Sequence, residues 1–454
     1  MSLKARKILF ILFIFAFLVI TPLVSLYAAG YKFTLSGEII QKTGMIVLDS
    51  QPEGAKIYIN GEPQQRFFDN LRSNILNDTE DRNILKTPAR IKGLFPGEYT
   101  VTLLKDGYWE WEKKLEVFPG QSTFAEDVVI FKNNLPLPLS SGEILNSQQS
   151  SSKEFLAFST KDKYLVLGED EQVLFYDKNS ENLESQNNYI KWFGNNQILF
   201  DNHLFSLDTW SKPVDLSAYL NNINLEFISP IDSKNIYAIK DNQLVKLNLS
   251  RGSVESVLKS EKILDYFAKG DFIYTIEELG GDVFLIVYNG TETIRKIDLN
   301  KDNSFRFTNK EHELINIYSP RFKTLHLIDP LDYFGPLKET INNVNRSFWV
   351  DSNKLVFYND FEIWIYNRVD FKKNILTRIS DKISTVLWHP SNNYIIYSTQ
   401  ESLFTIELDD REKHTTNHLI KLNNIDFLNM SNDGYTLYFY SSLGKKEGLY
   451  KLAI

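Results

Sequence analysis

One short pattern recurs along most of the 454-residue chain and restricts the folds open to it. Its clearest copy, residues 388–408, has an aromatic strand end at Trp388, a polar turn at residues 390–393 and two β-rich runs split by residues 400–402. A hairpin of this kind has two open edges and one apolar face, so it is marginally stable alone and needs neighbours. The pattern therefore predicts an array of β-hairpins that pack on one another.

The copies follow one another at a regular distance. Their second strands are expected at positions separated by 34 to 42 residues, namely Tyr164, Ile198, Ile236, Phe272, Leu314, Leu355, Tyr394 and Thr436. A period of about 40–45 residues is typical of a four-stranded propeller blade. Counting gives eight blades, or seven if the poor copy at Leu314 is left out. The turns, most closely residues 431–434, resemble the Ser-Pro-Asp-Gly-type repeat of TolB-type and WD-repeat-like β-propellers.

The ends of the repeat region indicate how the ring closes. The last unit, residues 448–454, is a third strand with no fourth strand after it. An upstream segment must then pair with its open edge. Residues 137–145 are the expected closing strand, within a linker at residues 133–152, and the propeller itself is expected at residues 153–454.

The N-terminus carries a candidate membrane anchor. Lys4, Arg6 and Lys7 precede residues 8–30, which contain no charged side chain and are long enough to cross a bilayer core of about 30 Å as a helix. The basic residues predict a cytoplasmic tip and a single-pass segment in residues 1–30, with all later domains outside. The alternative is a signal peptide that is cleaved near Ala28 or Ala29.

Residues 44–132, after a linker at residues 31–43, carry a second set of motifs. They comprise Pro52-Glu53-Gly54-Ala55, a hairpin turn at Asn60-Gly61, Thr87-Pro88-Ala89, and the turns at residues 93–99 and 105–108. This ordered set resembles the PEGA domain, and the resemblance implies a small β-sandwich. Residues 64–86 depart from the family pattern and are expected to form an inserted polar loop.

Residues 109–117 show the alternation of a half-buried strand. Trp109, Trp111, Leu115 and Val117 fall on one face, with Lys113 as the single exception. The aromatic pair is expected in the sandwich core, and the alternative is a platform on which a sugar stacks.

Composition excludes several classes of function. The chain has no cysteine, which excludes disulfides and thiolate metal sites. Its net charge of −8 argues against a nucleic-acid partner. An aromatic content of 14% favours strands. The overall expectation is therefore an all-β protein with an N-terminal transmembrane helix.

Three motifs resemble binding sites but are expected to be loops or turns. His414 and His418 have the spacing of a helical metal pair but lie where no helix is expected. Residues 169–171 are acidic but lack the ligand spacing of a calcium loop, and Gly280-Gly281-Asp282 lacks the signals of a phosphate loop. No catalytic, cofactor or metal site is predicted, and the residues that bind a partner are not identified.

These observations favour a non-catalytic, membrane-anchored extracytoplasmic protein of the cell surface. Residues 8–30 would contact the membrane, the PEGA-like domain would act as a spacer or envelope-interaction domain, and the propeller would bind an envelope protein or a glycan. The alternative is a hydrolase or lyase with a site in the central funnel of the propeller, since propellers host both functions.

Overall fold

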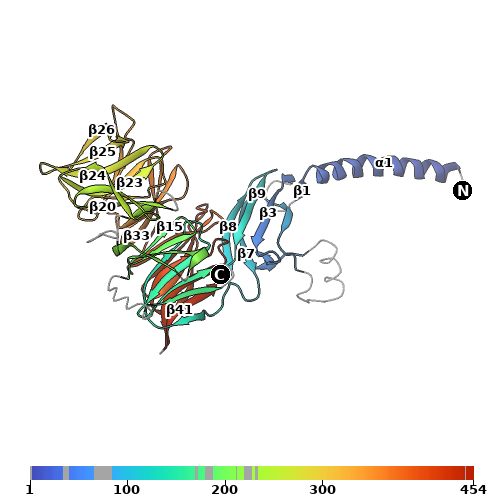
Figure 1. Cartoon of the computed structure of the whole chain (residues 1–454). Helices are drawn as coiled ribbons and strands as arrows, with labels where there is room; N and C mark the ends of the chain where they lie inside the picture. Colours follow the sequence, from blue (N-terminus) through green and yellow to red (C-terminus); the bar gives the residue numbers. More distant parts are fainter. Residues whose placement is uncertain are drawn as a thin grey trace.

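The computed structural model contains one long helix, a small β-sandwich and an eight-bladed β-propeller, in that order along the chain (Figure 1). The structure describes residues 3–33, 40–65, 84–168, 172–178, 188–210, 212–218, 228–230, 234–444 and 446–454. The predicted all-β class with an N-terminal apolar helix is confirmed.

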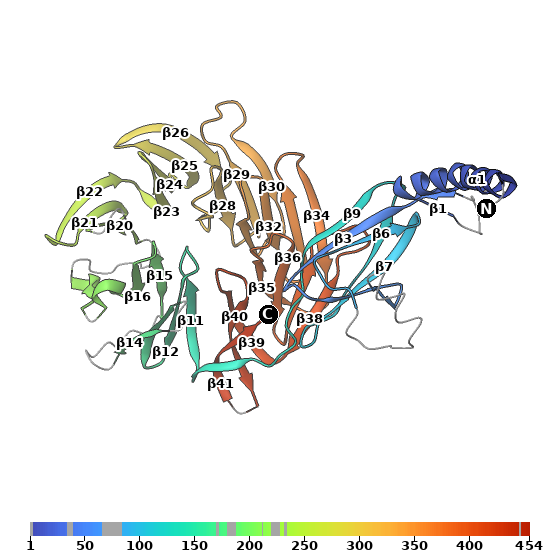
Figure 2. The same ribbon diagram turned by 90° about the vertical axis from the view of Figure 1, so that its right-hand side faces the viewer.

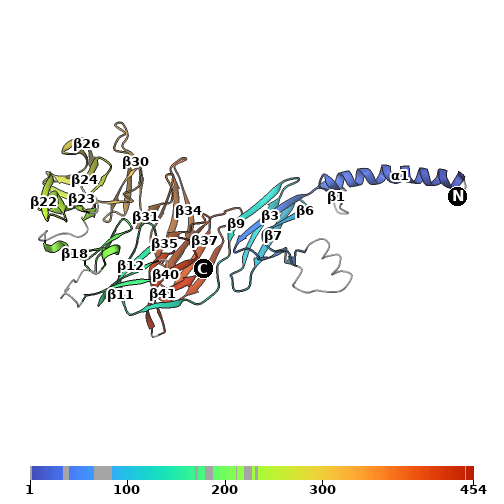
Figure 3. The ribbon, with the colours of Figure 1, turned by 45° about the vertical axis from the view of Figure 1, so that its right-hand side comes forward.

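The helix, α1 (Leu3–Ala28), extends from the far end of the sandwich, away from the propeller (Figure 3). Large apolar side chains are exposed along it from Ile8 to Tyr27. Within its 23-residue span Arg6–Ala28, an 18-residue stretch has a mean hydropathy of 2.9 and is not covered by any described part of the chain. At about 1.5 Å per residue this span is roughly 35 Å long, which is enough to cross a bilayer.

Two short strands follow the helix within the expected linker and pair with each other, β1 (Tyr31–Phe33) and β2 (Ile40–Lys42). The sandwich then packs two sheets on a common core. One sheet has the order β6 (Ala89–Leu94), β3 (Gly44–Gln51), β9 (Ser122–Val129), with β3 and β9 parallel. The other has the order β5 (Glu62–Pro63), β4 (Lys56–Ile59), β7 (Gly97–Leu104), β8 (Trp111–Val117).

The sequence motifs of this domain form its turns and joints. Asn60 and Gly61 have positive φ angles of 51° and 81°, as the predicted hairpin turn between β4 and β5 requires. Ala55 and Thr87 are joined by two hydrogen bonds, one from each backbone N–H. The inserted loop is closed at its base by pairing of Gln65 with Ile84, and its residues 66–83 lie outside the described residues.

The propeller consists of eight four-stranded antiparallel sheets, so the weak copy near Leu314 is a true blade. Blades 1 to 4 are β11 (Ile144–Gln149), β12 (Phe155–Thr160), β13 (Lys163–Gly168), β14 (Val173–Asp177); β15 (Ile190–Phe193), β16 (Gln197–Phe200), β17 (His203–Ser206), β18 (Val214–Asp215); β19 (Ser229–Pro230), β20 (Asn235–Lys240), β21 (Gln243–Asn248), β22 (Ser253–Lys259); and β23 (Lys262–Lys269), β24 (Phe272–Leu279), β25 (Asp282–Asn289), β26 (Glu292–Leu299). Two short 3₁₀ helices, η3 (Leu207–Thr209) and η4 (Leu216–Ala218), flank β18.

Blades 5 to 8 complete the ring. They are β27 (Arg306–Thr308), β28 (Ile315–Ser319), β29 (Thr324–Ile328), β30 (Leu337–Ile341); β31 (Arg346–Trp349), β32 (Lys354–Tyr358), β33 (Glu362–Asn367), β34 (Lys372–Arg378); β35 (Ile383–Trp388), β36 (Tyr394–Thr399), β37 (Ser402–Glu407), β38 (Thr416–Lys421); and β39 (Asn423–Met430), β40 (Thr436–Leu443), β41 (Lys446–Ala453) with β10 (Leu137–Ser141). Figure 2 shows the blades following one another around the ring.

The expected second strand of the first repeat is wrong by one strand. Tyr164 lies on β13, the third strand of blade 1, whereas Ile198, Ile236 and the other copies lie on or next to second strands. The true second strand, β12, begins 42 residues before β16, so the short first step disappears. The first strand of blade 1, β11, lies in the segment expected as linker, because its Ser/Gln-rich sequence lacks a strong apolar alternation.

The closing strand of the ring comes from the same segment. Strand β10 pairs antiparallel with β41 from Leu137–Lys451 to Ser141–Gly448 and completes blade 8. Gly448 is required here, because a Cβ at this position would overlap the carbonyl oxygen of Ser140.

Buried apolar clusters join every pair of neighbouring blades within the described ranges. Blades 1 and 2 meet through Tyr164 and Phe200, whose rings stack with centroids 4.5 Å apart. Blades 8 and 1 meet through Leu449 and Ile144. The ring is therefore held by apolar packing at each junction as well as by strand β10.

Candidate functional site

The sandwich packs against one side of the propeller, at blades 7 and 8. Residues that follow strand β9 enter the apolar cluster between these blades, where the Phe131 ring lies edge-on to Tyr394 with centroids 5.2 Å apart. The backbone N–H of Val129 donates to the Tyr394 hydroxyl at 3.2 Å. Burial and the nearby Glu407 carboxylate raise the pKa of Tyr394 well above 10, so this hydroxyl stays protonated.

Lys113 forms the polar centre of this junction. It is the exception in the alternation of strand β8, and its position in the strand places it on the buried face. Its side chain is completely buried and reaches across to blade 7, where its ammonium donates to the Glu407 carboxylate at 3.0 Å and to the Asp409 carbonyl at 2.6 Å. The Asp409 carboxylate lies 3.4 Å away. A buried ammonium without such partners would be strongly unfavourable.

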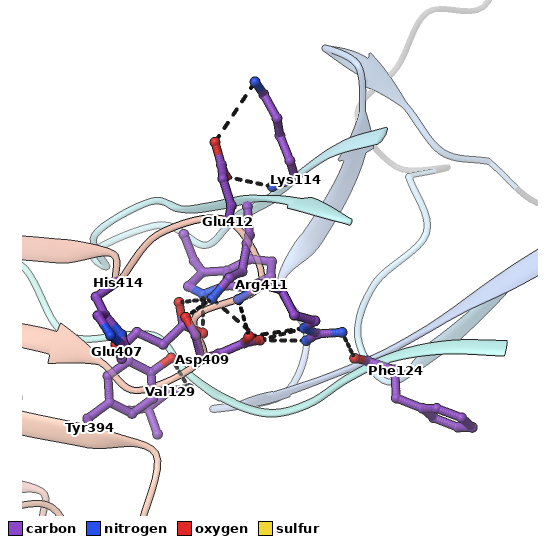
Figure 4. A network of polar contacts seen from close by, with 11 residues as sticks. Lys114, Phe124, Val129, Tyr394, Glu407, Asp409, Arg411, Glu412 and His414 are labelled. Carbon is purple, nitrogen blue, oxygen red and sulfur yellow. Dashed lines mark hydrogen bonds and ion pairs between the residues drawn. The ribbon is translucent and has the colours of Figure 1, made fainter. Parts of the chain in front are cut away.

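Arg411 completes the network from the β37–β38 loop, residues 408–415 (Figure 4). Its guanidinium binds both carboxylate oxygens of Asp409 and donates to the Phe124 carbonyl of strand β9 at 2.6 Å. Burial raises the pKa of Asp409, but hydrogen bonds from Arg411 and the charge of Lys113 outweigh burial and bring it down to about 2. Two cations, Lys113 and Arg411, thus balance two carboxylates, Glu407 and Asp409.

The two tryptophans of the alternating segment have different positions. Trp111 is 2% exposed and lies in the sandwich core as expected, while its indole N–H also donates to Glu407 at 3.2 Å. Trp109 precedes strand β8 and packs on the cluster between blades 7 and 8 instead of in the sandwich core. Neither ring forms an open platform for a sugar.

The histidine and glycine motifs take part in the fold and do not form a common site. His414 lies in the β37–β38 loop next to the Glu407 carbonyl, and His418 lies on strand β38 next to the Ser402 hydroxyl. Gly280 and Gly281 form the predicted turn, with φ angles of 60° and 87°. Residues 169–171 lie outside the described residues. Among the residues that the structure describes, no group of three His, Asp or Glu side chains could hold a metal.

Buried carboxylates on blade 4 connect strands. Asp265 lies on β23, the first strand of blade 4, and accepts hydrogen bonds from the backbone N–H groups of Tyr266 and of Phe307 on blade 5. Glu277, on β24, accepts hydrogen bonds from the hydroxyls of Ser260, Thr275 and Tyr288. Both carboxylates therefore already accept hydrogen bonds from neighbouring backbone N–H groups or hydroxyls.

The β29–β30 loop of blade 5, residues 329–336, presents an apolar surface to solvent. Leu331, Tyr333 and Phe334 are 57%, 62% and 103% exposed, and Leu337 at the start of β30 is 55% exposed. An exposed apolar group of this kind marks an interaction surface more often than a structural element.

This apolar loop is held in one shape by polar groups. The carboxylate of Asp332 accepts hydrogen bonds from the backbone N–H groups of Phe334 and Gly335 and forms an ion pair with Lys338. The hydrogen bond from Lys338, together with the two N–H groups, lowers the pKa of Asp332 to about 2. The guanidinium of Arg295 lies 4.6 Å from the Tyr333 ring centroid and donates to the Tyr333 carbonyl.

Sequence reasoning missed both features. For the junction, the available signal was Lys113 itself, a single lysine on an otherwise apolar strand face. For the loop, it was an aromatic pair, Tyr333 and Phe334, inside a turn segment that also contains Gly335 and Pro336.

Comparison with protein families identifies the sandwich domain. Residues 80–127 match the model of the PEGA domain family. No curated protein sequence matches the chain.

Solved propeller structures resemble the chain in part. One described as the Dos1 propeller has 12% identity, covers 71% of this chain and 95% of its own, and has a TM-score of 0.47. One described as a eukaryotic initiation factor has 13% identity, covers 69% of this chain and 86% of its own, and has a TM-score of 0.46. Hsv2p of Kluyveromyces lactis has 9% identity, covers 61% of this chain and 99% of its own, and has a TM-score of 0.41. The protein combines a PEGA domain, which the family model identifies, with a C-terminal β-propeller, which its eight four-stranded sheets form.

Proposed function

We propose that the protein is a membrane-anchored extracytoplasmic binding protein. Helix α1 holds the chain in the cell membrane, the PEGA domain is the spacer, and the propeller binds an envelope protein or glycan. The observation that carries the binding role is the β29–β30 loop, which is fixed by Asp332 and exposes Tyr333 and Phe334.

The apolar surface of helix α1 supports the anchoring role. A helix that exposes apolar side chains from Ile8 to Tyr27 is unfavourable in water. It must therefore lie in a lipid bilayer, as an anchor or as a signal sequence that is later cleaved. Lys4, Arg6 and Lys7 at its start favour a cytoplasmic N-terminus.

The Lys113 junction supports the spacer role. A fully buried ion pair together with apolar packing at Phe131 resists separation of the PEGA domain from blades 7 and 8. A spacer joined in this way fixes the direction in which the propeller faces.

The composition of the β29–β30 loop favours a partner protein over a glycan. Aromatic side chains accompanied by arginine dominate the centres of protein interfaces. Tyr333, Phe334 and Arg295 are of these types, and the loop is ordered before binding, which lowers the entropic cost of association.

The enzyme alternative finds less support. An active-site carboxylate is expected to face a cavity and to have free hydrogen-bonding capacity. Asp265 and Glu277 on blade 4 are instead used by neighbouring strands and hydroxyls.

The test uses the full chain produced in intact cells, with photo-reactive side chains placed at Phe334 and, as a matched control, at Phe371. Phe371 is also an exposed aromatic, on the β33–β34 loop of blade 6. Crosslinking in intact cells should give one defined adduct from position 334 that Tyr333→Ala removes, and binding to isolated cell-wall glycan is measured in parallel. Equal adducts at both positions would contradict a specific site. Turnover in a hydrolase or lyase screen that is lost with Asp265→Asn would favour the enzyme.

A further inference from the structure

A cavity lies where helix α1 meets the sandwich. It has a volume of about 790 Å³ and is lined by the end of α1, strands β1 to β3, the Lys92–Gly93 end of β6 and the turn at Gly120. Three lysines, Lys32, Lys42 and Lys92, line it, and no acidic side chain is among the described residues that do.

Glycines bring two of these lysines into the cavity. The ammonium of Lys32 donates to the Gly93 carbonyl at 2.8 Å, and a Cβ on Gly93 would lie only 2.6 Å from that nitrogen. A Cβ on Gly120 would likewise lie 2.5 Å from the Lys42 side chain. Both glycines have positive φ angles, so the close approach depends on residues without a side chain. An ammonium has three donors, so Lys32 can bind an anion while it keeps its bond to Gly93.

The cavity begins at the last residues of the membrane-crossing segment. Its lining includes Tyr27 and Tyr31, on either side of the helix end. Tyrosines of this kind are enriched at the level of the lipid headgroups. A helix about 35 Å long in a hydrocarbon core of about 30 Å places the lysines at that level.

We infer that this cavity binds the phosphate of an anionic phospholipid from the leaflet into which the end of α1 emerges. This inference rests on the proposed membrane anchor. The three ammonium groups attract the headgroup, and the acyl chains extend along the exposed apolar side chains of α1. The bound lipid then fixes the angle between the helix and the sandwich.

The test compares lipid retention by two variants of equal net charge. The full chain is reconstituted in phosphatidylcholine vesicles that contain a minor fraction of phosphatidylglycerol, extracted in mild detergent, and its bound lipids are counted by mass spectrometry. Lys32→Gln/Lys42→Gln/Lys92→Gln removes the cavity charges. The control, Lys86→Gln/Lys132→Gln/Lys161→Gln, removes three exposed lysines from other parts of the described surface.

The wild type and the control should retain phosphatidylglycerol in preference to phosphatidylcholine, and the cavity variant should lose this preference by roughly tenfold. Equal retention by all three proteins would overturn the inference. Displacement of the lipid by excess inorganic phosphate would also overturn it, since the cavity would then bind a soluble anion. Release of the wild-type chain from vesicles by alkaline carbonate would instead reject the membrane anchor. A chain that stays in the vesicles without lipid preference rejects only the lipid site.

Discussion

Two loops in equivalent positions of the propeller differ in the character of their side chains: one is charged and the other is apolar. The β37–β38 loop of blade 7 and the β29–β30 loop of blade 5 both join the third and fourth strands of their blades, so both emerge on the same side of the ring. The first is charged and packs against the sandwich, where Arg411 pairs with Asp409 and donates to the Phe124 carbonyl. The second is apolar and uncovered, with Phe334 fully exposed.

The difference shows how each loop satisfies its side chains. At the β37–β38 loop, Lys113 neutralises the buried carboxylate of Glu407, and Arg411 neutralises the partly exposed carboxylate of Asp409. At the β29–β30 loop, Tyr333 contacts Arg295, but Leu331, Tyr333 and Phe334 stay largely exposed, and Asp332 keeps the loop ordered. An ordered apolar loop without a cover is typical of a binding surface.

The largest expected effect comes from opening blade 8, which packs against the blade that carries the β37–β38 loop. Gly448→Ala should displace β10, because the new methyl group would overlap the Ser140 carbonyl oxygen. Deletion of residues 137–141 should have the same effect and expose the edge of β41 to aggregation. Size-exclusion chromatography checks both. Gly444→Ala, at an exposed turn with open space around it, is the control for a glycine substitution, although its positive φ adds a small cost. A monomeric, fully folded deletion variant would show that β10 is dispensable.

Loss of Lys113 should break the junction itself. Lys113→Ala leaves Glu407 buried without its cation, and such a loss typically costs about 3–5 kcal/mol in the free energy of unfolding. Lys114→Ala, at a 55% exposed side chain, should cost no more than about 1 kcal/mol. Chemical denaturation measures both. Lys113→Met with Glu407→Gln should recover part of the loss, since Arg411 still pairs with Asp409; equal costs for Lys113→Ala and Lys114→Ala would contradict the assignment.

Lowering the pH should destabilise the junction at the β37–β38 loop before it affects the β29–β30 loop. Burial lowers the pKa of His389, which packs on Phe131 at the junction, to about 4. The contribution of neutral His389 to folding stability is fully present above pH 6.5, where this side chain is neutral in the folded and the unfolded chain. It is lost as the pH falls toward 4, because in this range His389 gains a proton only in the unfolded chain. The difference corresponds to about 3 kcal/mol. His389→Gln should flatten the fall in stability between these values.

A residual slope is expected in that variant, because burial also lowers the pKa of His312 and His326. The β29–β30 loop should keep its hydrogen bonds throughout this range, since the pKa of Asp332 is about 2. Amide hydrogen exchange at Phe334 and Gly335 checks this. Loss of their protection at the same pH as the junction would show that the two loops are coupled.

The smallest effect on stability is expected at the uncovered loop. Tyr333→Ala and Phe334→Ala remove exposed side chains, so each should change the free energy of unfolding by less than about 0.5 kcal/mol while it reduces partner binding. Thermal unfolding and crosslinking yield measured from the same samples separate the two roles. A loss of stability comparable to that of Lys113→Ala would mean that the loop is part of the core.

The sequence predicted the parts that repeat. Each blade reuses a polar turn between β-rich strands, so eight units could be counted even where one copy was weak. The predicted strand order is wrong only in blade 1, because the sequence of β11 lacks a clear apolar alternation and resembles a linker. The open edge at residues 448–454 predicted a closing strand, and β10 pairs there.

The site could not be predicted in the same way, because it depends on contacts between distant residues. Lys113 and Glu407 are 294 positions apart, and no local pattern links them. The alternation in strand β8 marked Lys113 as an exception but did not identify its partner. The exposed aromatic side chains at residues 331–337 could equally have been core residues, since exposure depends on the whole fold.

If the Lys113 network holds the sandwich and the propeller as one rigid unit, the distance between the two domains should have a single value. The chain has no cysteine, so two introduced cysteines can be spin-labelled uniquely. Glu53→Cys on the sandwich and Gln400→Cys on blade 7 are exposed positions on the two domains. Pulsed electron spin resonance on the full chain should give one narrow distance distribution that broadens with Lys113→Ala. A distribution that is already broad in the otherwise unchanged protein would contradict a rigid junction.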